Sequence, residues 1–184
     1  MALVESNEFK HGTLAPDFNL LNVVTNQVQS LTDLKGEKGT VVMFICNHCP
    51  FVLHVNHELA NIANDYLSKG INFIAISSND IINYPQDGPN QMKKVAETLS
   101  YPFPYLYDET QETANAYDAA CTPDFYLFDA DLKSTYHGQL DDSRPGNSIP
   151  VSGNSMREAM DDLLNHGEGI ANQKPSIGCS IKWK

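Results

Sequence analysis

The sequence has little positive charge. Lys and Arg number 12 against 23 Asp and Glu, which gives a formal net charge of -11, and the only arginines are Arg144 and Arg157. The longest basic run is the pair Lys93 and Lys94. Nucleic-acid backbones and anionic membrane surfaces both favour clusters of Lys and Arg. We therefore expect no nucleic-acid partner and no membrane partner.

Long hydrophobic runs are also missing. No segment approaches the roughly 18 apolar residues of a membrane-spanning helix. The sequence opens MALVESNEFKHG, which has neither the basic start nor the apolar stretch of a secretory signal. We therefore expect a cytoplasmic protein. Thiols stay reduced in that compartment, where a clustered cysteine pair is more often catalytic or metal-binding than structural.

Cysteine is scarce, and disulfide bonds are not needed to hold a core. The chain has 184 residues and four cysteines. A chain of this length buries roughly 70% of its unfolded surface on folding. Hydrophobic residues make up 41% and charged residues 19%, which is typical of a folded globular protein. The length favours a single domain.

Apolar residues alternate between strand-like and helix-like spacing. Continuous apolar runs at 40–45 and 71–77 predict strands buried on both faces. Residues 125–128 and 134–140 predict an antiparallel hairpin, and a further hairpin is expected between 18 and 30. Helical spacing predicts four helices: one from about Val52 to Tyr66, one starting at Pro89, one between Asp108 and Tyr117, and one ending before Gly167. This order predicts an α/β fold with a central sheet covered by helices on both faces.

The motif Cys46-Asn47-His48-Cys49 lies between the predicted strand 40–45 and the helix that follows it. Unpaired backbone N–H groups and the helix dipole at a helix N-terminus favour a thiolate. We expect Cys46 to be the exposed cap residue with a lowered pKa, and Cys49 to lie one turn inside the helix. Cys46 would then attack a disulfide and Cys49 would resolve the mixed disulfide, while His48 and Asn47 tune the thiolate.

Two other interpretations of this Cys-x-x-Cys motif stay open, namely half of a zinc site and an incidental pair. A zinc ribbon needs a second pair of ligands, and Cys121 and Cys179 are isolated in the sequence. His54 and His57 follow on the same predicted helix but fall on its polar face, and we expect both to be solvated. We therefore expect no metal and no organic cofactor.

A strand, a Cys-x-x-Cys motif, a long helix and a later Thr-Pro before a hairpin together resemble the thioredoxin fold. The segment Gly12-Thr13-Leu14-Ala15-Pro16-Asp17-Phe18 is similar to the opening of the redoxin branch, which includes the AhpC/TSA peroxiredoxins and the TlpA/ResA-like oxidoreductases. Three further segments resemble one bacterial thioredoxin-like subfamily: Cys-Asn-His-Cys-Pro at 46–50, Cys-Thr-Pro-Asp-Phe at 121–125 and Gly-Cys-Ser-Ile-Lys-Trp at 178–183.

This resemblance implies a thioredoxin-like three-layer sandwich, in which helices flank a central mixed β-sheet that has an N-terminal β-hairpin extension. The redoxin domain would cover residues 1–168, and residues 169–184 would form an irregular C-terminal tail. The implied activity is that of a thiol-disulfide oxidoreductase with Cys46 and Cys49 as its dithiol. Thr122 and Pro123 would form the cis-proline element that docks the substrate. The implied partners are protein or small-molecule disulfides and thiols, with a dithiol protein as electron donor.

The departures from the family pattern leave alternatives open. The peroxiredoxin signature Pro-x-x-x-Thr-x-x-Cys is absent, because Cys46 stands at its Thr position and Cys49 at the position of its peroxidatic Cys. A thiol-dependent peroxidase that acts on hydroperoxides as an antioxidant is the alternative within this fold. Sco-type copper chaperones use Cys-x-x-x-Cys with a distant His, whereas the cysteines here are one residue closer and the available His137 lies in the later hairpin. A redox-inert interaction domain is the last alternative.

Cys121 and Cys179 are candidates for an additional redox thiol. Cys121 stands two residues before Pro123, and Cys179 lies in the tail, which shows no apolar periodicity. Cysteine is among the most frequently buried residue types, so a lone cysteine is more often a small hydrophobe than a reactive group. We therefore expect structural or idle thiols at both positions.

Overall fold

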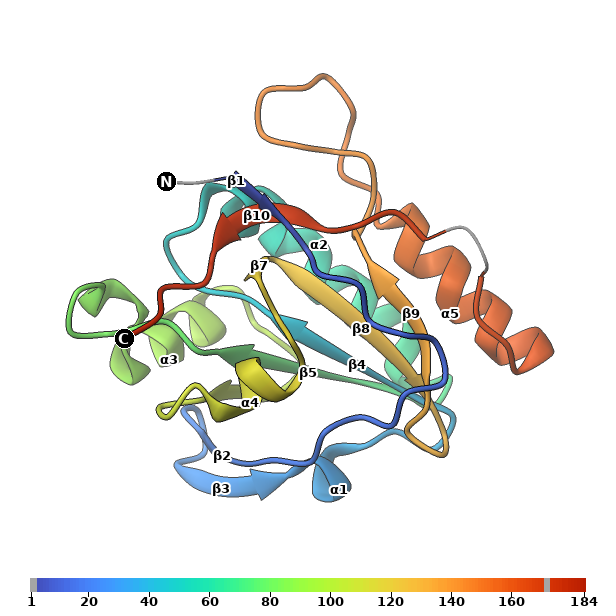
Figure 1. Ribbon diagram of the computed structural model, residues 1–184, viewed down its shortest axis with the longest axis horizontal. Coiled ribbons are helices and arrows are strands. Elements are labelled where there is room, and N and C mark those ends of the chain that lie inside the picture. The colour runs from blue at the N-terminus through green and yellow to red at the C-terminus, as the bar shows by residue number, and fades with distance from the viewer. Residues whose placement is uncertain (1–2, 171–172) are drawn as a thin grey trace.

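A seven-stranded sheet forms the centre of the computed structural model, which describes residues 3–170 and 173–184 (Figure 1). Its strand order is β3-β2-β6-β5-β4-β8-β9. The neighbours β4, β5 and β6 run parallel, and the other neighbouring strands run antiparallel. The strands are β2 (Asn19–Asn22), β3 (Gln27–Ser30), β4 (Gly39–Phe44), β5 (Ile71–Ser77), β6 (Tyr105–Tyr107), β8 (Asp124–Asp129) and β9 (Ser134–Gly138). The predicted mixed sheet and both predicted hairpins are confirmed.

Strand β4 lies in the middle of the sheet and is buried along its whole length. It pairs with β5 on one side and with β8 on the other. Because side chains alternate along a strand, Val41 and Met43 enter one core, while Val42 and Phe44 enter the core on the opposite face. The continuous apolar run in the sequence therefore reflects burial on both faces.

The helices form the two outer layers. They are α1 (Leu31–Leu34), α2 (Pro50–Leu67), α3 (Pro89–Thr98), α4 (Glu112–Ala116) and α5 (Asn154–His166), with a short 3-10 turn, η1 (Pro85–Asp87). Apolar residues of α2, α3 and α5 pack into one core, and residues of α1 and α4 pack into the other. In Figure 1 the N-terminal segment crosses in front of β8 and β9, and α2 lies behind them. The three layers agree with the expected sandwich.

The expectation of an irregular C-terminal tail is wrong for one segment. Strand β10 (Ile177–Ser180) pairs antiparallel with β1 (Leu3–Glu5) on one side and with β7 (Cys121–Thr122) on the other. All three strands are very short, and their hydrogen-bond partners are far away in sequence, so no local hydrophobic period announces them. The proposed division into 1–168 and 169–184 stays a prediction.

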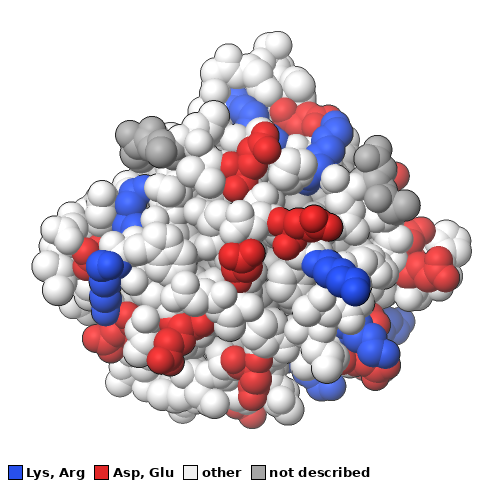
Figure 2. Space-filling view, viewed as in Figure 1, with Lys and Arg blue, Asp and Glu red and all other residues white. Residues whose placement is uncertain are grey.

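Charged side chains of both signs are interspersed on the face shown in Figure 2. The two arginines hold parts of the fold together. Arg157 bonds Glu58 and Asp65 of α2, each at 2.7 Å, while Arg144 donates to the backbone carbonyl of Asp141 at 2.6 Å. Within the described parts of the chain, no helix combines the length and the apolar character needed to cross a bilayer.

Candidate active site

Cys46 and Cys49 lie where the chain leaves β4 and enters α2, and the helix starts later than expected. Its first residue is Pro50, so the cap position belongs to Cys49. Cys46 is 2% exposed and Cys49 is 0% exposed, so the expectation of an exposed, helix-capping Cys46 is wrong. Proline favours the first helical position, where its missing N–H costs nothing, and this fixes the start of the helix.

The Thr122–Pro123 segment lies against both sulfur atoms. Thr122 Oγ1 is 3.4 Å from Cys46 Sγ, and the carbonyl oxygen of Thr122 is 3.2 Å from Cys49 Sγ. The peptide bond between Thr122 and Pro123 is cis. The structure therefore brings together the two segments that the resemblance singled out, although they are more than 70 residues apart in sequence.

A third cysteine completes this group. Strand β10 places Cys179 directly opposite Thr122 of β7. The sulfur atoms of Cys179 and Cys49 are 2.7 Å apart. Its isolation in the sequence is therefore misleading, because strand pairing carries Cys179 to the Cys-x-x-Cys motif. The neighbouring Cys121 is also buried, and its Sγ lies 3.9 Å from the carbonyl oxygen of Pro123.

A buried carboxylate lies on the other side of Cys46. Asp87, at the end of η1, is 0% exposed and accepts three hydrogen bonds. Its donors are the backbone N–H of Asn47 at 2.8 Å, the side-chain amide of Asn79 at 2.8 Å and Nδ1 of His48 at 2.6 Å. The ring of His48 also stacks on Tyr84, with centroids 5.4 Å apart. Asp87 thus fixes the loop that carries Asn47 and His48.

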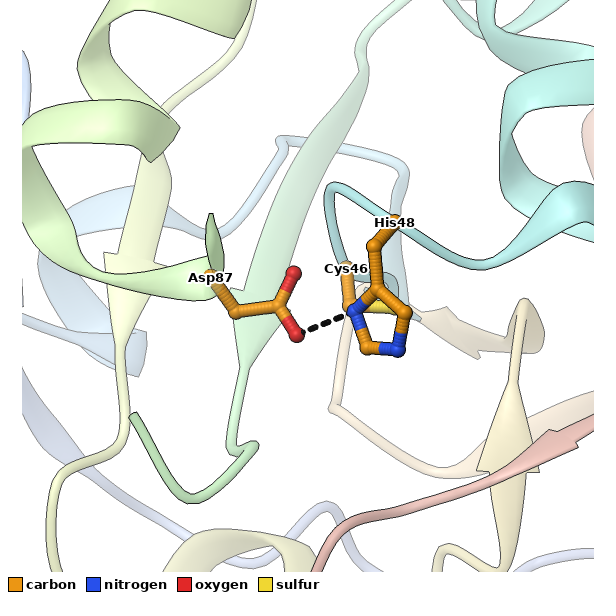
Figure 3. A group of neighbouring side chains, drawn as sticks. All are labelled: Cys46, His48 and Asp87. Carbon is orange, nitrogen blue, oxygen red and sulfur yellow. Dashed lines mark hydrogen bonds and ion pairs between the residues drawn. The ribbon is translucent and has the colours of Figure 1, made fainter. Parts of the chain in front are cut away.

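Sequence analysis missed Asp87 because it lies in a short polar turn without periodicity. Figure 3 shows how the fold brings it beside Cys46 and His48, which come from the loop after β4. One ligand atom from each of these residues lies within 4.8 Å of the others, the one such group of three in the parts of the chain that the structure describes. Thiolate, imidazole and carboxylate are zinc ligands. Nδ1 of His48 is bonded directly to Asp87. The expected absence of a metal stays a prediction.

The other histidines lie elsewhere. His57 is exposed, as expected. His54 is half-buried, and its Nε2 lies 2.7 Å from Ser143 Oγ, so the expectation that it is solvated is wrong. His137 Nε2 bonds the buried carboxylate of Asp124 at 3.0 Å.

Hydrogen bonds between the sulfur atoms decide where negative charge rests. The S–H of Cys46 donates to Cys49 and, against the cost of burial, lowers the pKa of Cys49 to about 5, with further help from Cys179 and the backbone N–H of Val52. The same bond raises the pKa of Cys46, as do burial and the negative charge of Asp87. Burial and the bond to Cys49 raise the pKa of Cys179 to about 12, and burial also raises the pKa of Cys121. These shifts favour a thiolate at Cys49 over the expected thiolate at Cys46.

The chain is similar to one known protein family and to several solved structures. A model described as the AhpC/TSA family matches residues 11–137, more than half of the chain. The structure is similar to that of an uncharacterized conserved protein from Geobacillus kaustophilus, with a TM-score of 0.97, 64% identity and coverage of 100% of this chain and 97% of that one. A hypothetical protein from Sinorhizobium meliloti 1021 gives a TM-score of 0.95, 41% identity and 98% coverage of both chains.

A more distant likeness identifies the fold. The thioredoxin domain of a thiol-disulfide oxidoreductase from Bacteroides vulgatus gives a TM-score of 0.62 and 19% identity, covering 73% of this chain and 92% of that one. This likeness confirms the thioredoxin-like α/β fold. No curated protein matches the chain.

Proposed function

The chain belongs to the AhpC/TSA family, and we propose that it is a thiol-disulfide oxidoreductase that works through Cys46 and Cys49. The observation that carries this proposal is the contact of Thr122 with both sulfur atoms, at 3.4 Å from Cys46 and 3.2 Å from Cys49. A substrate that docks along this segment would meet the dithiol directly. The family and its fold support oxidoreductase chemistry in general, and the paired thiols support disulfide exchange in particular.

The proposed reaction begins with a proton transfer inside the pair. Cys46 gives its proton to the Cys49 thiolate through their shared hydrogen bond. The Cys46 thiolate then attacks one sulfur of the substrate disulfide, and the other substrate sulfur leaves as a thiolate that takes up a proton. Cys49 loses its proton again and attacks Cys46, which forms the Cys46–Cys49 disulfide and releases the second substrate thiol. Two electrons have passed to the substrate, and an external dithiol protein returns them.

Asp87 is a positioning residue in this proposal. It touches neither substrate nor sulfur in the steps above, but it holds the backbone of Asn47 and the ring of His48. These two residues separate the cysteines, so their placement sets the geometry of the pair and the field at Cys46. These bonds support the prediction that Asn47 and His48 tune the reactivity of the pair.

Reduction of insulin disulfides with dithiothreitol as electron donor tests the proposal. We expect Cys46→Ser and Cys49→Ser each to lose turnover by on the order of 100-fold or more, because exchange needs both sulfurs. Cys49→Ser should also accumulate a mixed disulfide through Cys46. Cys121→Ser, which removes a buried thiol outside the pair, is the matched control. Wild-type turnover in Cys46→Ser would overturn the proposal.

A peroxidase is the second candidate, because a pKa of about 5 makes Cys49 a thiolate at neutral pH. Cys49 also stands where the family signature places the peroxidatic cysteine. Against this function, the signature Thr is replaced by Cys46. The bonds of Arg157 and Arg144 go to carboxylates of α2, to backbone carbonyls and to the side chain of Gln139. Stopped-flow oxidation by hydrogen peroxide separates the two. A rate no faster than that of a free thiol excludes the peroxidase, and a rate on the order of 100-fold higher establishes it.

The proposed setting is the cytoplasm, where a reduced dithiol protein would supply electrons and protein or small-molecule disulfides would be the substrates. A Sco-type metal function is the remaining alternative, and the grouping of Cys46, His48 and Asp87 gives it a specific site to test. Elemental analysis of the purified protein decides, since one bound metal ion per chain would favour that function over disulfide exchange.

A further inference from the structure

Cys49 and Cys179 are not joined by a disulfide bond, and their sulfur atoms lie unusually close together. Their sulfur atoms are 2.7 Å apart, whereas a disulfide bond measures about 2.0 Å. Cys179 is 4% exposed, so it lies in the same water-poor surroundings as the Cys-x-x-Cys motif. Only a small movement separates this pair from a disulfide.

Cys49 is the sulfur that the other two cysteines share. It interacts with the thiols of both Cys46 and Cys179, and both interactions lower its pKa. In the parts of the chain that the structure describes, the sulfur atoms of Cys46, Cys49 and Cys179 do not all lie within 4.8 Å of one another. Cys46 and Cys179 are therefore two separate partners of one central sulfur, and Cys49 can be bonded to only one of them at a time.

The position of Cys179 is built into the fold. A Cβ at the preceding residue, Gly178, would lie 2.0 Å from the carbonyl oxygen of Thr122, so β10 approaches this segment as closely as a backbone can. The chain is also fixed on both sides of the strand. Ser176 Oγ donates to the Gly138 carbonyl at 2.6 Å, and the backbone N–H of Lys182 donates to Asn79 at 2.8 Å.

We propose that Cys179 is a third redox thiol, which exchanges with the Cys46–Cys49 disulfide to form a Cys49–Cys179 disulfide. This inference rests on the redox function proposed for the dithiol. In the step, Cys179 loses its proton and attacks the sulfur of Cys49. The Cys46–Cys49 bond breaks, the Cys49–Cys179 bond forms, and the electron pair leaves on Cys46, which takes up the proton. No oxidant or reductant is consumed.

The exchange changes which face of the site is reactive. After the exchange, the disulfide joins the buried residues Cys49 and Cys179, and Cys46 is again a thiol beside His48 and Asp87. Cys46 can then engage a second sulfur compound while the chain is still oxidised. The reverse step regenerates the Cys46–Cys49 disulfide, so the site alternates between two disulfides that share Cys49.

Oxidation of the Cys46→Ser variant with oxidised glutathione tests this proposal directly. The thiols that are still free are then alkylated under denaturing conditions, and the disulfides are mapped by mass spectrometry. We expect two thiols to be lost in a Cys49–Cys179 disulfide and Cys121 to be alkylated. Cys46→Ser with Cys121→Ser should form the same disulfide. Cys46→Ser with Cys179→Ser should instead hold a glutathione adduct on Cys49.

The outcome that would overturn the proposal is a folded Cys46→Ser chain that keeps three thiols, or that holds the same glutathione adduct as the double variant without Cys179. Circular dichroism checks the fold, and Cys46→Ala serves as a second background. Failure of the proposed function looks different. If the Cys49–Cys179 disulfide forms but the wild-type chain does not reduce insulin, only the proposed activity is contradicted. If the wild-type chain reduces insulin normally but this disulfide does not form, only the proposed role of Cys179 is contradicted.

Discussion

The two sides of the Cys46–Cys49 pair offer a sulfur atom different surroundings. On the side of Cys46 lies a buried carboxylate, Asp87, which is bonded to the ring of His48. On the side of Cys49 lie the thiols of Cys46 and Cys179 and the backbone N–H of Val52 in α2. The first side opposes negative charge on sulfur, and the second side supports it.

This contrast shows that the motif alone does not decide which cysteine is ionised. Both cysteines are buried and three residues apart, so residue type and exposure do not distinguish them. The hydrogen-bond donors around each sulfur distinguish the two cysteines, because a hydrogen bond to a charged atom contributes about 1.5–3 kcal/mol. Breaking each side in turn should therefore have separate consequences.

We expect the largest loss of stability when β10, the strand that carries Cys179 to Cys49, is displaced. Gly178→Ala places a methyl group 2.0 Å from the Thr122 carbonyl, which forces β10 away. We expect the free energy of unfolding in urea to fall by about 3 kcal/mol. In the Cys46→Ser background, the yield of the Cys49–Cys179 disulfide should also fall by about 10-fold, since the sulfurs lose their alignment.

Gly88→Ala is the control for this substitution. An added Cβ there would meet a single close atom, the Pro85 carbonyl oxygen at 3.3 Å. We expect a loss below about 1 kcal/mol, as for a glycine replaced at a helix cap. Equal losses in the two variants would mean that β10 is not closely held against Thr122.

We expect the next largest loss of stability from a change at Asp87, the buried carboxylate on the side of Cys46. Asp87→Asn keeps the shape of the side chain but turns an amide toward donors from Asn47, Asn79 and His48. Because a buried network then loses acceptors, we expect urea unfolding to show a loss of about 2–3 kcal/mol. The pKa of Cys46 should also fall, because the negative charge that raises it is gone.

A surface pair of the same chemistry provides the comparison. His166 and Asp162 lie four residues apart on α5, with Nδ1 and Oδ1 2.8 Å apart, and the histidine is exposed. Asp162→Asn should change the unfolding free energy by less than about 0.5 kcal/mol. If Asp87→Asn were equally mild, Asp87 would not be the residue that positions the loop.

The hydrogen bond inside the pair can be measured by pH titration of thiolate absorbance near 240 nm. The wild-type chain should show one thiolate appearing near pH 5, since the pKa of Cys49 is about 5. Cys46→Ala removes the largest cause of this lowering, so we expect the midpoint to rise by about 1–2 units. Cys49→Ser should remove the step altogether, and survival of the step in that variant would place the charge on another residue.

The same titration predicts a pH dependence of stability. The folded pKa of Cys49 is lowered, so the folded chain holds the thiolate at pH values where the unfolded chain still binds the proton. This stabilisation is complete above the unfolded pKa, about 8.5, and is lost as the pH falls through about 5. Urea unfolding of the wild-type chain and of Cys49→Ser should therefore diverge as the pH rises from 5 to 8.5. Parallel curves would contradict this linkage.

The smallest effect is expected from Cys179→Ala. Its thiol is the lesser of the two sulfur donors to Cys49, so the midpoint should rise by less than about 1 unit. Cys121→Ala, which removes a thiol with no bond to Cys49, should leave the midpoint unchanged. A larger shift in Cys179→Ala than in Cys46→Ala would reverse the order of the two donors.

Local patterns in the sequence predicted much of this structure. The apolar runs of β4 and β5 and the helical spacing of α2 depend on neighbouring residues, so they are visible without the fold. They also placed the Cys-x-x-Cys motif between a buried strand and a helix. The helix α2 starts later than expected, at Pro50, and proline at the first helical position is itself a local signal.

The remaining parts of the site depend on contacts between distant segments. Asp87 lies in a turn whose sequence carries no period, and only the packing of η1 against the loop after β4 reveals its role. Cys179 reaches Cys49 because β10 pairs with β1 and β7, which are three and two residues long. Such short strands have no pattern of their own, so their register becomes visible only in the folded chain.

The measurement that most directly tests the redox role of Cys49 is equilibration of the wild-type chain in buffers of graded reduced and oxidised glutathione, followed by acid quenching, alkylation and mass spectrometry. We predict a two-electron transition in which two of the four thiols are lost and every disulfide contains Cys49. Four thiols at all glutathione ratios, or disulfides that leave Cys49 alkylated, would contradict this prediction.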